Sequence, residues 1–375
     1  MLDPRMQRLA ELLVRHSVRV QPGEKVLIEA YDIPTDMTVA LIKAVAAVGG
    51  QPLVSTYQQP VLRALYQAAS ADQMQLIGAV ERQRMEGVQC YIGMRGSNNT
   101  SEMSDVPRDK MDLYERHWWN HVHSQVRVPK TKWVVLRWPS PAMAQSAGMS
   151  TEAFEDYYFN VCAGVDYDAM QRAMEPLEAL MRRTDQVHIK GPGTDLRFSI
   201  KGIGVVPCFG ERNIPDGEIY TCPVKTSVEG YISYNCETLY RGTLFTNVHF
   251  AFDQGKIVKA EAGANTAKLN EILDSDEGAR YLGEWSFGVN PYISNPMRDT
   301  LFDEKIAGSF HLTPGQCYKE ASNGNDSQIH WDIVCRQDPA VGGGEIWFDG
   351  VLIRKDGRFV LPELQGLNPE ALTRA

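Results

Sequence analysis

The chain has 375 residues, which is more than one hydrophobic core usually supports and predicts two domains. Its 43% hydrophobic and 23% charged residues are typical of a globular protein. The 38 basic and 47 acidic residues give a net charge of −9, which argues against nucleic acid or an anionic membrane surface as a partner.

The seven cysteines are odd in number and scattered, and no Cys-x-x-Cys pair occurs among them. This distribution excludes a simple disulfide framework or zinc ribbon and favours a reducing compartment. The first twenty residues have the pattern of a polar amphipathic helix rather than of a signal peptide. Because no run approaches the roughly 20 apolar residues of a membrane span, we expect a cytoplasmic protein with no membrane partner.

The first half of the chain alternates strand and helix patterns. Residues 24–30 have the composition of a buried strand, 34–50 of a helix and 52–57 of a second strand, which together predict a βαβ unit. The apolar segments 88–94 and 132–138 add two more strands. We therefore predict an α/β domain with a mostly parallel sheet and helices on both faces. Glycine-rich nucleotide-binding motifs are absent from the sequence.

A histidine-rich segment within this half, RHWWNHVHS, would place His117 and His121 on one face of an α-helix. That spacing is found in metalloprotease helices, but the catalytic glutamate expected after the first histidine is replaced by Trp118. We interpret these histidines as surface or interface residues beside aromatic packing.

Residues 150–184 predict two helices, with Asp166 opening the second. From Val187 onward short strand patterns follow one another, with hairpin turns at 253–255 and 355–357 and one helix near 265–275. These patterns predict a mainly antiparallel α+β domain. We place the division between an N-terminal domain of residues 1–186 and a C-terminal, metal-binding domain of residues 187–375.

Most of the chemistry is concentrated in Ser309–Cys335, which holds His311, Tyr318, His330 and Asp332. If residues 328–335 form a strand, His330 and Asp332 share one face of it. A neighbouring imidazole and carboxylate suit a divalent cation such as zinc, cobalt or manganese. The pair alone is weak evidence, because polar strand faces are common.

Three glutamates upstream of this segment could bind the same cation. Glu218 follows a tight-turn sequence and opens a strand pattern, Glu284 lies in the apolar stretch YLGEWSFGVNP, and Glu304 ends TLFDE shortly before His311. A carboxylate buried in an apolar stretch is costly unless it is paired or bound to a cation. A cation is a reasonable partner, although Lys or Arg could also serve.

Four ordered segments, GERNIPDGEIYTCPV, LGEWSFGVNP, TLFDEKIAGSFHLTPGQCY and IHWDIV, resemble successive motifs of the thermophilic aminopeptidase family of dinuclear metallopeptidases. The resemblance covers essentially the whole C-terminal domain, and the N-terminal half fits the family's α/β domain more loosely. Two spacings depart from the best-known members: Glu304 to His311 is longer, and His311 to His330 is shorter.

The resemblance implies a metal-dependent aminopeptidase that hydrolyses N-terminal residues from peptides with a water activated by two divalent metal ions. Tyr318 matches the catalytic tyrosine, and Glu304 falls where the family has an acid near the site. It further implies a homodimer. The metal ligands carried over from the motifs are Glu218, Glu284, His311, His330 and Asp332.

Two other classes of protein compete with this interpretation. Ring-cleaving dihydroxypyridine dioxygenases have a similar fold and bind one iron through two His and one Asp. The presence of both Glu218 and Glu284 favours two metals, because a facial triad needs only three ligands. A binding protein without catalytic activity would have no chemical need for five convergent ligands.

Overall fold

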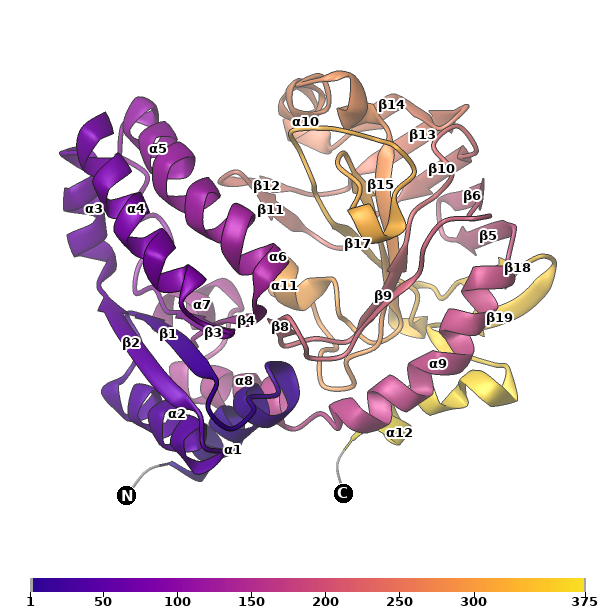
Figure 1. The fold of residues 1–375 in the computed structure, drawn as a ribbon. Helices are drawn as coiled ribbons and strands as arrows, with labels where there is room; N and C mark the ends of the chain where they lie inside the picture. Colours follow the sequence, from indigo (N-terminus) through magenta and orange to yellow (C-terminus); the bar gives the residue numbers. More distant parts are fainter. Residues whose placement is uncertain (1–2, 374–375) are drawn as a thin grey trace. The chain divides into compact units, whose positions relative to one another are not determined.

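The computed structural model describes residues 3–373, which form two compact units (Figure 1). Unit 1 comprises the chain up to Ala163 together with Gly210–Ile214, and unit 2 comprises Gly164–Phe209 and the chain from Pro215 onward. The domain division at 186/187 stays a prediction. Contacts in the structure group the preceding helix, α9 (Tyr167–Arg183), with unit 2, because it packs on β7 and η7 of that unit.

Unit 1 is built on one parallel sheet with the strand order β2-β1-β3-β4-β8. Its strands are β1 (Lys25–Tyr31), β2 (Gln51–Tyr57), β3 (Cys90–Arg95), β4 (Lys132–Arg137) and β8 (Asn213–Ile214). Its helices are α1 (Pro4–Leu12), α2 (Thr35–Ala47), α3 (Gln59–Gln67), α4 (Ala71–Glu86), α5 (Arg108–Tyr114), α6 (Val128–Lys130), α7 (Pro141–Ser146) and α8 (Thr151–Ala163), with the π-helical segments η1 (Leu13–Ser17) and η2 (Glu115–Arg127).

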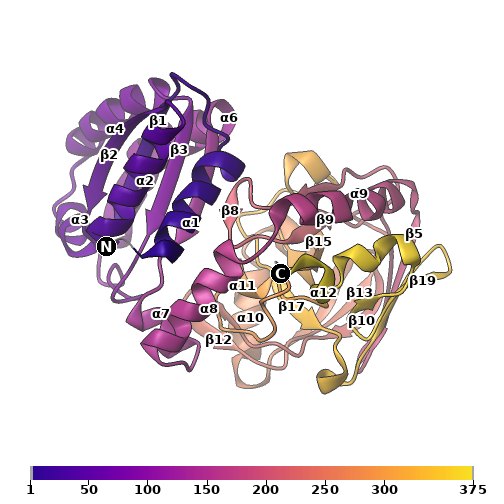
Figure 2. The same cartoon turned by 90° about the horizontal axis from the view of Figure 1, so that it is seen from below.

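Apolar side chains of the strands in unit 1 point alternately to the two faces of the sheet, and both faces are buried. Leu27 and Tyr91 join one apolar cluster with side chains of α3, α4 and η2. Val26 and Ile28 alternate with Leu27 and are also fully buried, so they point to the opposite face. Helix α2 packs on β1 and β2 without contributing to the cluster, which places it on that second face. Figure 2 shows β2, β1 and β3 side by side among these helices. The predicted α/β fold is confirmed.

The segment that holds His117 and His121 is π-helical, not α-helical. A π-helix has hydrogen bonds from i to i+5, so the i, i+4 spacing does not align these two side chains as in a metalloprotease helix. His121 instead lies 3.3 Å from the guanidinium of Arg82 through its Nδ1.

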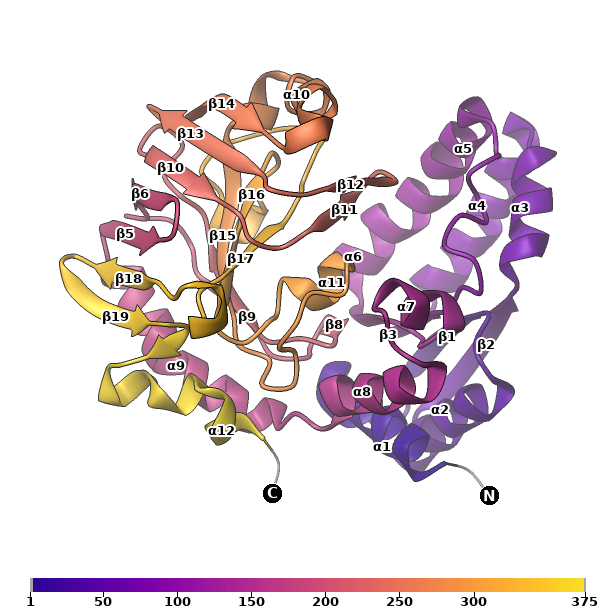
Figure 3. The same ribbon diagram turned by 180° about the vertical axis from the view of Figure 1, so that it is seen from behind.

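Unit 2 contains two antiparallel sheets and a two-stranded ribbon (Figure 3). The eight-stranded sheet has the order β14 (Lys256–Glu261), β13 (His249–Asp253), β10 (Glu229–Ser233), β6 (Thr194–Ser199), β5 (Gln186–Gly191), β18 (Glu345–Phe348), β19 (Val351–Lys355) and β20 (Arg358–Phe359). The five-stranded sheet has the order β17 (Ile333–Arg336), β16 (Ser309–Pro314), β15 (Leu282–Gly288), β9 (Glu218–Thr221) and β7 (Val206–Cys208), and the ribbon pairs β11 (Thr238–Tyr240) with β12 (Thr243–Phe245).

Short helices connect these strands. The α-helices of unit 2 besides α9 are α10 (Thr266–Leu273), α11 (Thr300–Asp303) and α12 (Pro369–Leu372). The 3₁₀ segments are η3 (Gly263–Asn265), η4 (Glu277–Arg280), η5 (Lys319–Ala321), η6 (Pro339–Val341) and η7 (Pro362–Leu367). Both predicted hairpin turns are confirmed, because Gln254-Gly255 and Asp356-Gly357 adopt the positive φ angles that a tight hairpin needs.

The core of unit 2 is aromatic and lies between its two sheets. Trp285 of β15 packs edge-on against Phe198 of β6, with ring centroids 5.2 Å apart, and 5.9 Å from Phe348 of β18. Phe287, two residues further along β15, contacts Phe359 of β20 at 5.5 Å. One face of β15 is therefore committed to the core. Within residues 3–373, no helix combines the length and apolar character needed to cross a membrane.

His123 in η2 is a buried titratable group of unit 1. It is 3% exposed, and its Nδ1 has no hydrogen-bond partner among the described residues. Burial, together with the charges of Arg127 and Arg95, lowers the pKa of His123 to about 3. The unfolded chain, in which the histidine pKa is about 6.5, therefore binds a proton that the folded unit does not between these two values.

We predict that the stability of unit 1 decreases as the pH falls below about 6.5, because the unfolded state binds more protons there. Between pH 6.5 and pH 4 His123 accounts for about 3 kcal/mol of this loss, at about 1.4 kcal/mol per unit. Replacement by Phe, which keeps a ring in place, should flatten the pH dependence of urea unfolding. The control is His117→Gln on the same segment, which should keep the wild-type slope; an unchanged slope in His123→Phe would contradict the prediction.

Candidate metal centre

Strand β15 is the centre of the five-stranded sheet and carries the candidate ligand Glu284. Glu284 and Ser286 lie on one face of the strand, opposite the face that packs into the core. On one side Ser286 is paired with His311 of β16. On the other side Gly288 is paired with Glu218 of β9. The antiparallel register thus brings three of the five predicted ligands together on one face.

His330 and Asp332 arrive from outside the regular sheet. Of the strand considered for residues 328–335, only the second half is present, because β17 begins at Ile333 and His330 forms an isolated bridge with Gly315. Both side chains nevertheless point the same way. His330 Nε2 lies 3.3 Å from Asp332 Oδ1. Thr313 Oγ1 donates a 2.6 Å hydrogen bond to the same oxygen and orients the carboxylate.

The two carboxylate oxygens of Glu284 face two different imidazoles. Oε1 lies 2.9 Å from Nε2 of His311, and Oε2 lies 3.6 Å from Nε2 of His330. Nε2 of His311 also lies 3.6 Å from Oε2 of Glu218. Ligand atoms that share a tetrahedral zinc ion at about 2.1 Å are separated by about 3.4 Å. The two 3.6 Å separations are close to this value, so this set of ligand atoms fits a divalent cation.

Among residues 3–373, three groups of side chains have ligand atoms within 4.8 Å of one another. Two of them share Glu284: Glu218, Glu284 and His311 form one, and Glu284, His330 and Asp332 form the other. The third consists of Cys208, Asp216 and Glu218. Burial raises the pKa of the Cys208 thiol well above its usual value, which disfavours the thiolate that a metal requires.

The charged side chains of this cluster influence one another's protonation. Burial raises the pKa of Glu284. Burial opposes protonation of both imidazoles, but a hydrogen bond to Glu284 raises the pKa of His311 to about 9, and the charge of Asp332 raises that of His330 to about 10. Burial acts against ionisation of Asp332 as well, yet the pKa of its carboxyl is depressed by His330.

The residues fit a divalent cation by a further observation. Glu284 is 3% exposed, and its Oε2 has no hydrogen-bond partner among the described residues. A buried carboxylate oxygen without a partner is costly, and a cation between Glu284 and His330 would remove that cost. The mixed carboxylate and imidazole set is one that zinc, cobalt and manganese accept.

Tyr318 lies in the loop that follows β16, beside the candidate ligands. Its ring centroid is 4.8 Å from that of His330 and 5.5 Å from that of Tyr220. Tyr318 is 46% exposed as a whole residue, so it is not a packed core residue, and its burial beside the acidic cluster raises the pKa of its phenol well above the usual value. The predicted catalytic tyrosine is therefore adjacent to the cluster.

Glu304 also joins the cluster, with a partner that sequence reasoning missed. Glu304 is 8% exposed, and its carboxylate pairs with the ammonium of Lys305. Burial raises the pKa of Glu304; the charge of Lys305 opposes this rise, and the charge of Glu218 adds to it. Ser286, which donates a 3.1 Å hydrogen bond to Oε2 of Glu218, was missed as well. The only sequence signal for Lys305 was its place beside Glu304.

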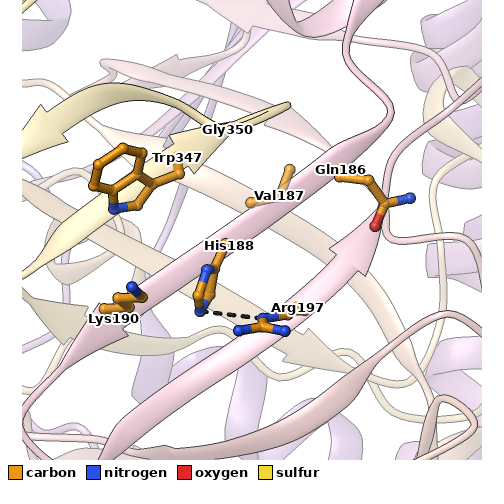
Figure 4. A pocket seen from close by; sticks show the side chains of 7 residues that line it. All are labelled: Gln186, Val187, His188, Lys190, Arg197, Trp347 and Gly350. Carbon is orange, nitrogen blue, oxygen red and sulfur yellow. Dashed lines mark hydrogen bonds between the residues drawn. The ribbon is translucent and has the colours of Figure 1, made fainter.

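Cavities elsewhere lack this chemistry. A cavity of about 300 Å³ on β5, β6 and β18 is lined by basic side chains, in which Arg197 donates to His188 (Figure 4). A larger one of about 980 Å³ lies in unit 1 beside the carboxyl ends of β1 and β2. Neither contributes a residue to the three metal-compatible groups found in the described chain.

Known proteins similar to this chain include aminopeptidases and a dioxygenase. Aminopeptidase T of Thermus thermophilus is 32% identical over 213 residues, an alignment that spans 49% of this chain and about half, 50%, of the relative's length. The solved structure of wild-type AmpT from Thermus thermophilus superimposes with a TM-score of 0.77 at 23% identity, over 95% of this chain and 99% of that one. The structure of 2,5-dihydroxypyridine dioxygenase from Pseudomonas putida gives 0.62 at 13% identity, over 96% and 98%.

These two structures share the fold of this chain. The sequence profile of the family described as thermophilic metalloprotease (M29) matches residues 2–359, which is nearly the entire chain and includes all five predicted ligands. The match confirms the family expected from the four C-terminal motifs, and a metalloprotease uses a divalent metal. The chain therefore belongs to the thermophilic metalloprotease family M29.

Proposed function

We propose that this protein is a metal-dependent aminopeptidase that removes N-terminal residues from peptides. The observation that carries the proposal is the position of Glu284, whose Oε1 faces His311 and whose Oε2 faces His330. A carboxylate between two ligand groups is what a pair of neighbouring metal ions requires. The names of the relatives, aminopeptidases T, PepS and AmpS, support the same reaction.

The proposed site uses five ligands, Glu218, Glu284, His311, His330 and Asp332, for two divalent ions of zinc, cobalt or manganese. Bound metal would supply an activated water and polarise the scissile carbonyl. Tyr318 is an uncharged hydrogen-bond donor at neutral pH and stabilises the oxyanion as the carbonyl is attacked. Glu304, buried and with a raised pKa, carries a proton toward the leaving amine.

The competing function is a mononuclear iron dioxygenase of the dihydroxypyridine type. The shared fold with that enzyme favours it, because two His and one Asp are enough for a facial iron site. Glu218 and Glu284 argue for hydrolysis, since the iron site has no use for two additional buried carboxylates in contact with His311. The homodimer and the cytoplasmic location expected from the sequence stay predictions.

The direct test is a screen of aminoacyl chromogenic substrates with Zn²⁺, Co²⁺ or Mn²⁺ added to metal-stripped protein. We expect metal-dependent release of the chromophore from substrates with a free α-amine. The N-acetylated version of the best substrate should be refused, because an exopeptidase recognises the amine. Ring cleavage of 2,5-dihydroxypyridine with Fe²⁺ and oxygen, in the absence of hydrolysis, would move the assignment to the dioxygenase.

Glu284→Gln keeps the shape of the side chain and removes its charge. We expect metal content, measured by elemental analysis after dialysis against metal, to fall at both ligand groups, because each uses one oxygen of this carboxylate. Glu261→Gln, which alters an exposed carboxylate of unit 2, is the matched control and should bind like the wild type. Full stoichiometry in Glu284→Gln would remove this residue from the ligand set.

Tyr318→Phe tests the oxyanion donor. Turnover should fall by roughly 10², the scale of losing one such hydrogen bond, while metal content stays at the wild-type level. Tyr231→Phe is a suitable control, because Tyr231 is exposed to a similar extent, 47%, and lies on β10 of the eight-stranded sheet. Normal turnover in Tyr318→Phe would show that the hydroxyl has no catalytic part.

A further inference from the structure

Lys305 is the cation that the five-ligand scheme leaves unexplained. Its side chain is completely buried, and its ammonium pairs with Glu304 and lies 3.4 Å from Oε1 of Glu218. Burying an ammonium is strongly unfavourable unless it is well paired. Lys305 therefore belongs to the carboxylate cluster as an integral charge.

The backbone brings this lysine to the sheet through a close approach at Gly288. A Cβ atom at position 288 would lie 2.4 Å from the carbonyl oxygen of Ile306 and 2.9 Å from that of Glu304, so only glycine lets the 304–306 segment pass over β15. The amide of Asn290 donates a 3.0 Å hydrogen bond to the carbonyl of Lys305. Gly288 is the cross-strand partner of Glu218, so the close approach of residues 304–306 to Gly288 places the ammonium of Lys305 beside that carboxylate.

The two carboxylate oxygens of Glu218 have different partners. Oε1 is turned toward the ammonium, whereas Oε2 accepts the hydroxyl of Ser286 at 3.1 Å and lies 3.6 Å from Nε2 of His311. One oxygen is thus committed to a fixed internal cation, and the other is oriented toward the imidazole with which it would share a metal.

The charge count supports a structural cation at this position. Four carboxylates lie in the cluster, those of Glu218, Glu284, Glu304 and Asp332. Two divalent ions would balance these four charges, and Lys305 would balance a fifth, that of the neighbouring Asp216. The ammonium also acts on Asp216, a member of the third metal-compatible group, so that group already has a cation beside it.

We propose that Lys305 is a positioning residue of the metal centre: its ammonium holds Glu218 by Oε1, so that Oε2 alone is presented to a divalent ion beside His311. The inference rests on the proposed dinuclear site. In this role Lys305 acts through Glu218 rather than directly on substrate or metal.

The test is a calorimetric titration of metal-stripped protein with Zn²⁺ or Mn²⁺, with Lys305→Met beside the wild type. We expect the wild type to bind two ions, and Lys305→Met to bind one of them about tenfold more weakly or worse, the usual effect of losing a partner that orients a ligand. The other ion, held by Glu284, His330 and Asp332, should bind within about threefold of its wild-type affinity.

A second variant separates positioning from general damage to the fold. Glu304→Gln/Lys305→Met removes the carboxylate that loses its partner, and its thermal unfolding should return toward the wild type while the weakened ion stays weak. Wild-type affinity for both ions in Lys305→Met would overturn the inference, as would recovery of both affinities in the double variant. Failure of the wild type to bind two ions is a different result, because it would overturn the proposed dinuclear site itself.

Discussion

The register of strand β15 between β9 and β16 is the constraint on which the rest of unit 2 depends. Alternation sends Trp285 and Phe287 into the aromatic core and leaves Glu284 and Ser286 on the opposite face. A slip of one residue would exchange the two sets, placing a carboxylate in the core. The packing of the aromatic face therefore fixes which side of the sheet the charged residues occupy. The same strand register positions both the core and the candidate site.

Two glycines at opposite ends of β15 let neighbouring chain segments approach that polar face. A bulge at Gly283 precedes Glu284, and a Cβ there would lie 2.3 Å from the carbonyl oxygens of Gly315 and Gln316. That approach leads the chain to Tyr318, just as the approach over Gly288 leads it to Lys305. The proposed oxyanion donor and the buried cation thus reach the cluster from segments that only glycine admits.

The sequence was informative where local pattern and packing agree. The strands of the parallel sheet and the two hairpin turns follow from apolar runs and turn residues, and Glu284 stood out because a carboxylate in an apolar stretch needs a partner. Three features depended on tertiary contacts. The π-helical register of 115–127 changes which histidines lie on one face. Residues 328–332 lie outside the sheet, which the chain joins only at β17. The partner of Glu304 is the next residue in the chain, Lys305, which the close approach at Gly288 holds in place.

The buried cluster also bears on how the protein is held together. Four carboxylates, two imidazoles and one ammonium are kept on a sheet face where Oε2 of Glu284 lacks any hydrogen bond in the described structure. Such an arrangement is less stable than an apolar one of the same volume, because desolvation of each charge must be repaid by its partners. Divalent ions bound to folded but not to unfolded chain would return that energy to the native state. The sheet therefore keeps the candidate ligands in position although their burial lowers the stability of the folded state. The aromatic packing on the other face of β15 offsets this loss.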